Sequence, residues 1–356
     1  ETLPEGAEVI AKTADEALRT LNKYWHQALI APLLPLVGDA RRWIISPDKD
    51  LALLPFDTLP LALDEAGNTT EMLVQSHTST LVQSFSVFAL LKEREAQHAK
   101  LKRAKPMFAM GNAVYGPGWD TQQGMQRGRG QSAFRSADTD ALRGVNDSAR
   151  MMREGERYLM RDLRWQNLPG TAVEVEAAKS AFEAQGGADV LVGPKASEAT
   201  LQSLNDTGKL KDYQYLLFSA HGYLAQNPEL SALVLSQQDN PDGTDGYVTA
   251  AEWPLYDINS DLTVLSACDT GVGKTLAGEG VMGLPYALFI AGNRNTLLSL
   301  WPVDDDATAE FMRYFFTKLN EGLDQAQALA ETKRYFQRSA EWRHPRFWAA
   351  FVLYGV

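Results

Sequence analysis

One cysteine and one of five histidines are the residues of this chain best suited to nucleophilic chemistry. Cys268 follows the apolar run DLTVLSA at 261–267, and His221 follows a second run, YQYLLFSA at 213–220. If these runs are neighbouring strands of a parallel sheet, they end at the same edge, where ligands bind in such sheets. A thiol and an imidazole within reach of each other form an activated nucleophile, because the base takes the thiol proton.

Small residues surround both side chains. Ala220, Gly222, Ala267 and Gly271 would leave room for a substrate backbone. We expect the N–H groups of Gly222 and Cys268 to stabilise an oxyanion there. The remaining histidines lie outside this strand-end pattern, and we expect structural roles for all four: His26, His77, His98 and His344.

The elements that must position these residues indicate an α/β fold. More apolar runs, typical of strands buried on both faces, occur at 106–111, 189–193, 231–236, 296–301 and 349–355. Helical patterns occur between them, at 171–184, after Ser197 as a cap, and at 279–291, 306–320 and 322–339. We therefore predict a three-layer fold with a mostly parallel central sheet flanked by helices. The alternative is an α+β domain with an antiparallel sheet.

The N-terminal third has a different pattern. We expect residues 1–105 to form a helical and hairpin subdomain that packs on a catalytic core at 106–356. Within the subdomain we expect a helix over 14–35, two short strands around a Pro-Asp turn over 41–61, and an amphipathic helix over 80–102. Within the core, 112–168 is a long Arg-rich segment that we interpret as an insertion.

Composition excludes several classes of partner. The 356 residues carry a net charge of −11, which disfavours binding to nucleic acid. The longest apolar stretches, 29–38 and 347–356, are too short to span a membrane. We therefore expect no nucleic acid and no membrane partner. A single cysteine suits a reducing compartment, so we expect a cytoplasmic protein. Because the chain begins at Glu1 without Met or a signal-like segment, we expect a neighbouring segment before it.

The two strand-end motifs resemble those of caspase-like cysteine proteases. SAHG at 219–222 is followed 47 residues later by SACDTG at 266–271. More specifically, the chain resembles the CHAT proteases, bacterial relatives of caspases and separase. The matching pieces occur in family order: LALLPFDTLP (51–60), LPGTAVEVEAA (168–178), LVGPKASEATL (191–201), LLFSAHGYL (216–224), SALVLS (231–236), TVLSACDTGVG (263–273), GEGVMGLPYALFIAGN (278–293), SLWPVDDDAT (299–308) and FWAAFVLYG (347–355).

The resemblance implies a caspase-like fold and a cysteine endopeptidase that cleaves protein substrates. His221 and Cys268 would form a dyad that works through an acyl-enzyme, with no metal or organic cofactor. The resemblance also implies a regulatory module of sensor or helical-repeat type, either N-terminal to this chain or separate. A role in bacterial stress, antiphage or cell-death signalling is part of the same implication.

Substrate contacts are expected at the end of the 296–301 strand, which helps to line the cleft in caspase-like enzymes. Trp301 is the last residue of that strand, Asp304 and Asp305 follow it, and Glu279 is a further candidate. An acid there would favour Arg or Lys at P1, the substrate residue before the scissile bond, through a charge-assisted pair. The alternative for the acidic run is favourable charge at a helix N-terminus.

Two other function classes stay open. CDTGVGKT at 268–275 nearly matches a P-loop, so a nucleotide-binding switch could use Lys274 and Thr275, although Cys268 replaces the first glycine. A catalytically silent pseudo-protease would only bind partners. Asp269-Thr270-Gly271 also matches the aspartic-protease triplet, but that chemistry needs two carboxylates sharing a site.

Overall fold

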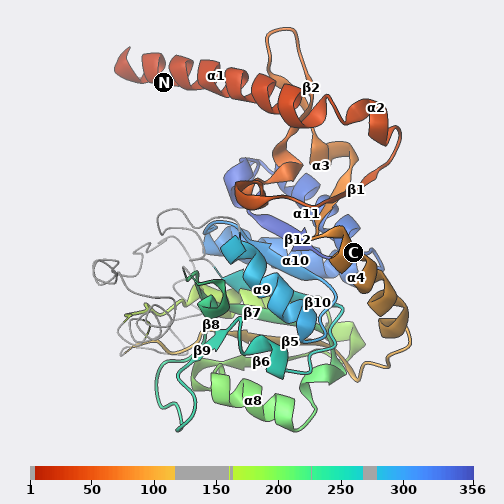
Figure 1. The fold of residues 1–356 in the computed structure, drawn as a ribbon. Coiled ribbons are helices and arrows are strands. Elements are labelled where there is room, and N and C mark those ends of the chain that lie inside the picture. Colours follow the sequence, from red (N-terminus) through yellow and green to blue (C-terminus); the bar gives the residue numbers. More distant parts are fainter. Residues whose placement is uncertain (1–4, 117–159, 161–162, 226, 268–278) are drawn as a thin grey trace.

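The computed structural model describes residues 5–116, 160, 163–225, 227–267 and 279–356 (Figure 1). Cys268, Gly271, Lys274 and Thr275 lie outside the described residues, as does most of the Arg-rich segment.

The core of the fold is a ten-stranded sheet. Its main path runs in the order β1-β4-β12-β11-β10-β7-β5-β6, while β8 pairs with β7 and β9 pairs with β8. The bounds are β1 Arg42–Ile45, β4 Thr78–Leu81, β5 Lys105–Gly111, β6 Ala188–Val192, β7 Tyr213–Tyr223, β8 Ala232–Val234, β9 Tyr247–Thr249, β10 Leu262–Ala267, β11 Thr296–Ser299 and β12 Phe351–Tyr354. Along the main path only β11 and β12 pair antiparallel, which confirms the mostly parallel sheet.

Helices cover both faces of this sheet. On one face lie α7 Gly170–Ser180, α10 Asp305–Asn320 and α11 Gln325–Arg338, and on the other lie α8 Glu198–Asp206 and α9 Glu279–Ile290. Successive residues of β5 show why its sequence is apolar throughout: Met107 joins the core on the α7 side, and Phe108 joins the core on the α8 side. Since neither face meets water, no polar alternation remains in such strands.

Side-chain caps set where several helices begin. Ser197 Oγ accepts a hydrogen bond from the Thr200 amide at 3.2 Å, which confirms it as the cap of α8. Asp324 accepts from the Gln327 amide at 2.9 Å at the start of α11. Each oxygen satisfies an amide that the first turn leaves without a helical partner.

The N-terminal region differs in detail from the sequence-based expectation. The first helix, α1 Glu5–Trp25, continues into a π-helical turn at His26–Ile30 and a short helix, α2 Leu34–Val37. The prediction of a second strand within 41–61 is partly wrong. Two 3₁₀ turns, Lys49–Leu53 and Phe56–Thr58, take up most of that segment, and a strand begins only at Pro60. Pro55 has no amide for a strand ladder, and its carbonyl accepts a hydrogen bond from Thr58 Oγ1 at 2.8 Å.

The helix expected over 80–102 begins later than predicted. Strand β4 takes residues up to Leu81, and α4 runs over Phe85–His98. Ser84 separates the two, because its hydroxyl accepts from the Val87 amide at 3.2 Å and so caps α4. A small second sheet pairs β2 Pro60–Leu63 with β3 Thr69–Met72 and leads into a short helix, α3 Leu73–Ser76.

The N-terminal region contributes to the central sheet. Strands β1 and β4 pair with each other, and β4 pairs with β12 through Leu81 and Tyr354. Helix α1 lies at the top of Figure 1, where its C-terminal end contacts the β2–β3 hairpin and its N-terminal part projects away from the rest of the chain. The division into domains at residue 105 stays a prediction.

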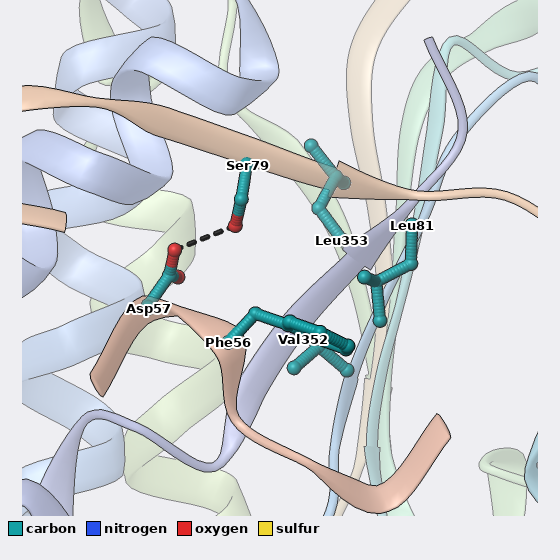
Figure 2. Close-up of a pocket in the computed structure, with 6 residues that line it drawn as sticks. All are labelled: Phe56, Asp57, Ser79, Leu81, Val352 and Leu353. Carbon is teal, nitrogen blue, oxygen red and sulfur yellow. Dashed lines mark hydrogen bonds between the residues drawn. The ribbon is translucent and has the colours of Figure 1, made fainter. Parts of the chain in front are cut away.

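A buried ion pair ties this N-terminal region to the end of the chain. Lys333 of α11 is fully buried, and its Nζ lies 2.5 Å from both Asp57 Oδ2 and the Phe351 carbonyl oxygen. Ser79 of β4 donates to the other oxygen of Asp57 at 2.5 Å (Figure 2). Asp57 and Ser79 also line a small pocket, together with Phe56, Leu81, Val352 and Leu353. None of the candidate catalytic or substrate-binding residues lines it.

The first prediction concerns this ion pair. Lys333→Ala should lower the free energy of unfolding by about 3–5 kcal/mol, because it leaves the Asp57 carboxylate buried without a cation. Urea unfolding measures the loss. Lys92→Ala is the control, since Lys92 pairs with Glu95 on the solvent-exposed surface. Such exposed pairs contribute about 0.3–0.5 kcal/mol to the free energy of unfolding. Equal losses in the two variants would contradict the role of the buried pair.

Candidate active site

Strands β7 and β10 are parallel neighbours, as the sequence predicts. Their ladder aligns Ser219 with Ser266 and Ala220 with Ala267. Ala220 directly precedes His221, and Ala267 directly precedes Cys268 in the sequence. The structure therefore brings the described strand ends together at one edge of the sheet, while Cys268 itself lies outside the described residues.

The His221 imidazole lies in an aromatic environment. The residue is 8% exposed, and its ring centroid lies 4.7 Å from that of Tyr115 and 4.9 Å from that of Trp165. Removal from water disfavours the charged imidazolium and lowers the pKa of His221 to about 4. The hydrogen bond that the ring donates to the backbone carbonyl of Gln166 opposes this shift but does not cancel it. His221 is therefore uncharged at neutral pH.

A single hydrogen bond fixes which ring nitrogen carries the proton. Nε2 of His221 lies 2.7 Å from the carbonyl oxygen of Gln166. A carbonyl oxygen can only accept, so Nε2 must donate its hydrogen. Nδ1 is then the unprotonated, basic atom of the ring.

Tyr115 also organises the backbone at this edge. Its hydroxyl accepts from the His221 amide at 3.2 Å and donates to the Val234 carbonyl of β8 at 2.8 Å, so it bridges the two strands. Burial raises the pKa of Tyr115, which keeps this hydroxyl protonated. Successive N–H groups of a strand point to opposite sides. The Gly222 N–H is therefore expected on the β10 side of β7, away from β8.

Trp165 is itself held in place by two further groups. Its indole Nε1 donates to the hydroxyl of Tyr247, on β9, at 2.8 Å. That hydroxyl donates in turn to the Met160 carbonyl oxygen at 2.6 Å. The indole plane next to His221 is thus fixed by hydrogen bonds as well as by packing.

Sequence reasoning missed this part of the site. From the sequence we interpret 112–168 only as an insertion, yet its described ends supply Tyr115, Trp165 and Gln166 around the imidazole. The stretch contains five large aromatic residues, and the two nearest its ends, Tyr115 and Trp165, are those that contact the imidazole. Gln166 could not have been found, since it acts through its backbone carbonyl, which every residue type carries.

The candidate substrate-binding residues lie near the ends of β11 and α10. Trp301 lies just beyond β11 and donates from Nε1 to the Arg346 carbonyl oxygen at 3.0 Å. Asp304 caps α10, with Oδ1 accepting from the Asp306 and Ala307 amides at 3.1 and 3.2 Å. The side chain of Glu279, the first residue of α9, lies outside the description.

Asp305 differs from Asp304 because its carboxyl turns towards α7. A Cβ added to Gly170, at the start of α7, would lie 2.1 Å from Asp305 Oδ2. Asp305 is exposed as a residue, but its carboxyl lies against the start of α7. Loss of water, with the charges of Asp304 and Asp306, raises the pKa of Asp305. The Asp304 carboxylate thus caps α10, whereas the Asp305 carboxyl does not.

The other histidines have structural contacts elsewhere. His98 lies 3.1 Å from the Asp261 carboxylate, and His26 lies 2.9 Å from the Pro60 carbonyl oxygen. His344 caps a 3₁₀ turn by accepting from the Arg346 amide. In the part of the chain that the structure describes, no three His, Cys, Asp or Glu residues are placed to hold a metal ion. No helix within that part has the length and apolar character needed to cross a membrane.

Two curated relatives cover the chain only in part. Tetratricopeptide repeat protein 28 of Mus musculus is 33% identical over 122 residues, which is 34% of this chain and 5% of that protein. The Homo sapiens protein of the same name is 35% identical over 108 residues, 30% of this chain and 4% of that protein. The chain therefore matches a small fraction of the length of these relatives.

Among solved structures, the chain is similar to two crystal structures of the Saccharomyces cerevisiae separase–securin complex. Both matches have a TM-score of 0.43 and 15% identity and cover 85% of this chain, but only 15% and 14% of the matched chains. This likeness is too low to carry an argument about activity. The CHAT domain model matches residues 18–356, nearly the entire sequence, and this chain belongs to the CHAT domain family.

Proposed function

We propose that this chain is a cysteine endopeptidase of the caspase-like type, with His221 and Cys268 as its catalytic dyad. The observation that carries the proposal is the register of β7 and β10, in which the residues before the imidazole and the thiol are paired. Membership of the CHAT family supports the same reaction class.

The reaction would proceed through an acyl-enzyme. Nδ1 of His221 takes the thiol proton as Cys268 sulfur attacks the scissile carbonyl carbon, and a C–S bond forms. The N–H groups of Gly222 and Cys268 would hold the resulting oxyanion. The imidazolium then protonates the leaving amine as the C–N bond breaks. Water, deprotonated by the same imidazole, hydrolyses the thioester and returns the thiol.

The environment of His221 supports its role as a base. A base must be unprotonated when the substrate arrives, and the low pKa of His221 meets that requirement at neutral pH. The Gln166 carbonyl stabilises the imidazolium that forms, since Nε2 remains its donor in both charge states. No side-chain carboxylate is needed to orient the ring.

We infer that the substrate is a protein with a basic P1 residue. Asp305 is the stronger candidate for recognition, because the Asp304 carboxylate already caps α10. Trp301 and Glu279 would form other parts of the cleft.

A helical-repeat module is the regulatory partner that we infer. Both curated relatives are named for tetratricopeptide repeats. Helix α1 also presents Leu18, Leu21 and Tyr24 to solvent, with exposed fractions of 55%, 47% and 60%. A row of apolar side chains on a projecting helix suits packing against another helix. Signalling in bacterial stress, antiphage defence or cell death is the biological setting that we infer from the family.

The second prediction tests the dyad. Cys268→Ala and His221→Ala should each abolish peptide cleavage, because one removes the nucleophile and the other removes its base. Fluorogenic peptide turnover and labelling of Cys268 by an acyloxymethyl ketone are the measurements. Proteolysis that persists in Cys268→Ala would overturn the assignment.

The alternatives give different outcomes in the same experiment. Lys274→Ala should leave cleavage nearly unchanged, whereas a P-loop switch would lose nucleotide binding in this variant. A pseudo-protease would neither cleave nor react with the ketone, even as the unaltered protein.

The third prediction concerns the charge state of His221. Trp165→Ala should admit water to the imidazole and raise its pKa from about 4 towards 6.5. NMR titration of the ring measures the shift. Activity should then fall on acidification at a higher pH than in the unaltered protein, because imidazolium cannot accept the thiol proton. Trp342→Ala is the control, since Trp342 stacks on Phe336 of α11 and should leave the titration of His221 unchanged.

The fourth prediction concerns P1 preference. Asp305→Asn should lower turnover of peptides with Arg or Lys at P1 by about tenfold or more, because a charge-assisted pair is lost. Thermal stability should change little. Asp304→Asn is the matched control, since Asn caps a helix as well as Asp does. A peptide library that selects Asp or an apolar residue at P1 would contradict the basic preference.

A further inference from the structure

A buried acid lies behind the two strand ends. Glu174 of α7 is 4% exposed, although the proposed reaction gives it no part. Ser219 Oγ of β7 donates to Glu174 Oε2 at 2.5 Å. Ser266 of β10 lies close enough to the Glu174 carboxyl to influence its pKa, although no hydrogen bond of normal geometry joins the two side chains. One side chain therefore meets both strands.

The two serines occupy equivalent places relative to the dyad. Ser219 and Ser266 are paired with each other across the ladder. Each lies two residues before a member of the dyad, Ser219 before His221 and Ser266 before Cys268. Because side chains alternate along a strand, Ser219 and His221 lie on the same face of β7. Any change in the spacing of these serines would move the strand ends as well.

No cation among the described residues compensates the acid. The charged group that faces it is Asp305 of α10, while β7 and β10 contribute the two serine hydroxyls. Burial, with a smaller effect of Asp305, raises the pKa of Glu174 to about 8, although the hydrogen bond from Ser219 and the nearby Ser266 hydroxyl oppose the shift. The acid is therefore mostly protonated at pH 7.

A proton on Glu174 also explains two polar atoms that lack partners. Glu174 Oε1 and Ser266 Oγ are both buried, and among the described residues neither makes a hydrogen bond of normal geometry. A protonated carboxyl can donate as well as accept. With the proton on Oε1, it can donate towards Ser266 Oγ while Oε2 accepts from Ser219.

We propose that Glu174 is a positioning residue, which links α7 to β7 and β10 through Ser219 and Ser266 and so holds the two strand ends, at Ala220 and Ala267, in register. This inference rests on the proposed function. The linkage uses the neutral acid, because an ionised Glu174 would be a buried charge with a second carboxylate facing it. Glutamine, which is neutral and nearly the same shape, should therefore replace glutamate better than alanine does.

The fifth prediction follows from this linkage. Glu174→Ala should lower kcat for peptide cleavage at least tenfold with little change in KM, and Glu174→Gln should retain it within about threefold. The rate at which iodoacetamide alkylates Cys268 gives a second readout that needs no peptide turnover. This rate should fall more in Glu174→Ala than in Glu174→Gln. Ser79→Ala is the control, because it removes a hydrogen bond to a different buried carboxyl, that of Asp57, away from the β7 and β10 ends.

The pH dependence separates positioning from simple packing. A native pKa near 8, above the ordinary 4.5, means that the folded protein holds more protons than the unfolded chain between these values. Stability should therefore decline as pH rises from 4.5 to 8, and Glu174→Gln should remove that slope. Activity should likewise persist to higher pH in Glu174→Gln.

The outcomes that overturn the proposal are distinct from those that overturn the protease assignment. Equal impairment of Glu174→Gln and Glu174→Ala, or unchanged kcat and alkylation in Glu174→Ala, would reject the role of Glu174. Loss of activity in Ser79→Ala to the same degree would also reject it. If Cys268→Ala remains active, the protease assignment fails first, and the alkylation rates still test whether Glu174 positions the β10 end.

Discussion

Parallel pairing of β7 with β10 is the constraint on which the candidate active site depends. Backbone hydrogen bonds hold the two strands over six aligned residue pairs, ending at Ala220 and Ala267. A parallel ladder places the carboxyl ends of both strands at one edge, so residues that follow them in sequence start from adjacent positions. A shift of one residue in this register would move Ser219 away from Ser266 and reverse the face on which each side chain lies.

That pairing is stable because the sheet is covered on both sides. Aromatic residues of α10 and α11, including Phe311, Phe315 and Phe336, pack on one face, while α8 and α9 cover the other. The N-terminal strands then extend the sheet past β12, and the buried Lys333–Asp57 pair fastens this extension to α11. The β7 and β10 ends are thus part of a rigid central layer, which suits a site that must hold two reacting groups close together.

The pKa values of His221 and Glu174 are shifted mainly by loss of water. Burial lowers the pKa of His221 and raises that of Glu174, so both are uncharged at neutral pH. The same physical cause acts in opposite directions, because it disfavours whichever form is charged. Each group is therefore buried without needing a counter-ion.

The sequence by itself determined the fold class and the two strands that carry the dyad. Long apolar runs must be buried on both faces, and each run that leads to His221 or Cys268 is one of them. It also determined the cap at Ser197, because capping depends on a few neighbouring residues. Where a local rule was misleading, as at Pro55, the structure has turns in place of a strand.

Only the tertiary structure decided what surrounds the imidazole. Tyr115 and Gln166 lie 106 and 55 residues from His221 along the chain, and one of them acts through its backbone carbonyl. The buried place of Glu174 between two strands was equally hidden, since a helical glutamate in sequence looks like any exposed one. Periodicity reports which face of an element is apolar. It cannot report which distant residue meets that face, because that depends on how the elements pack.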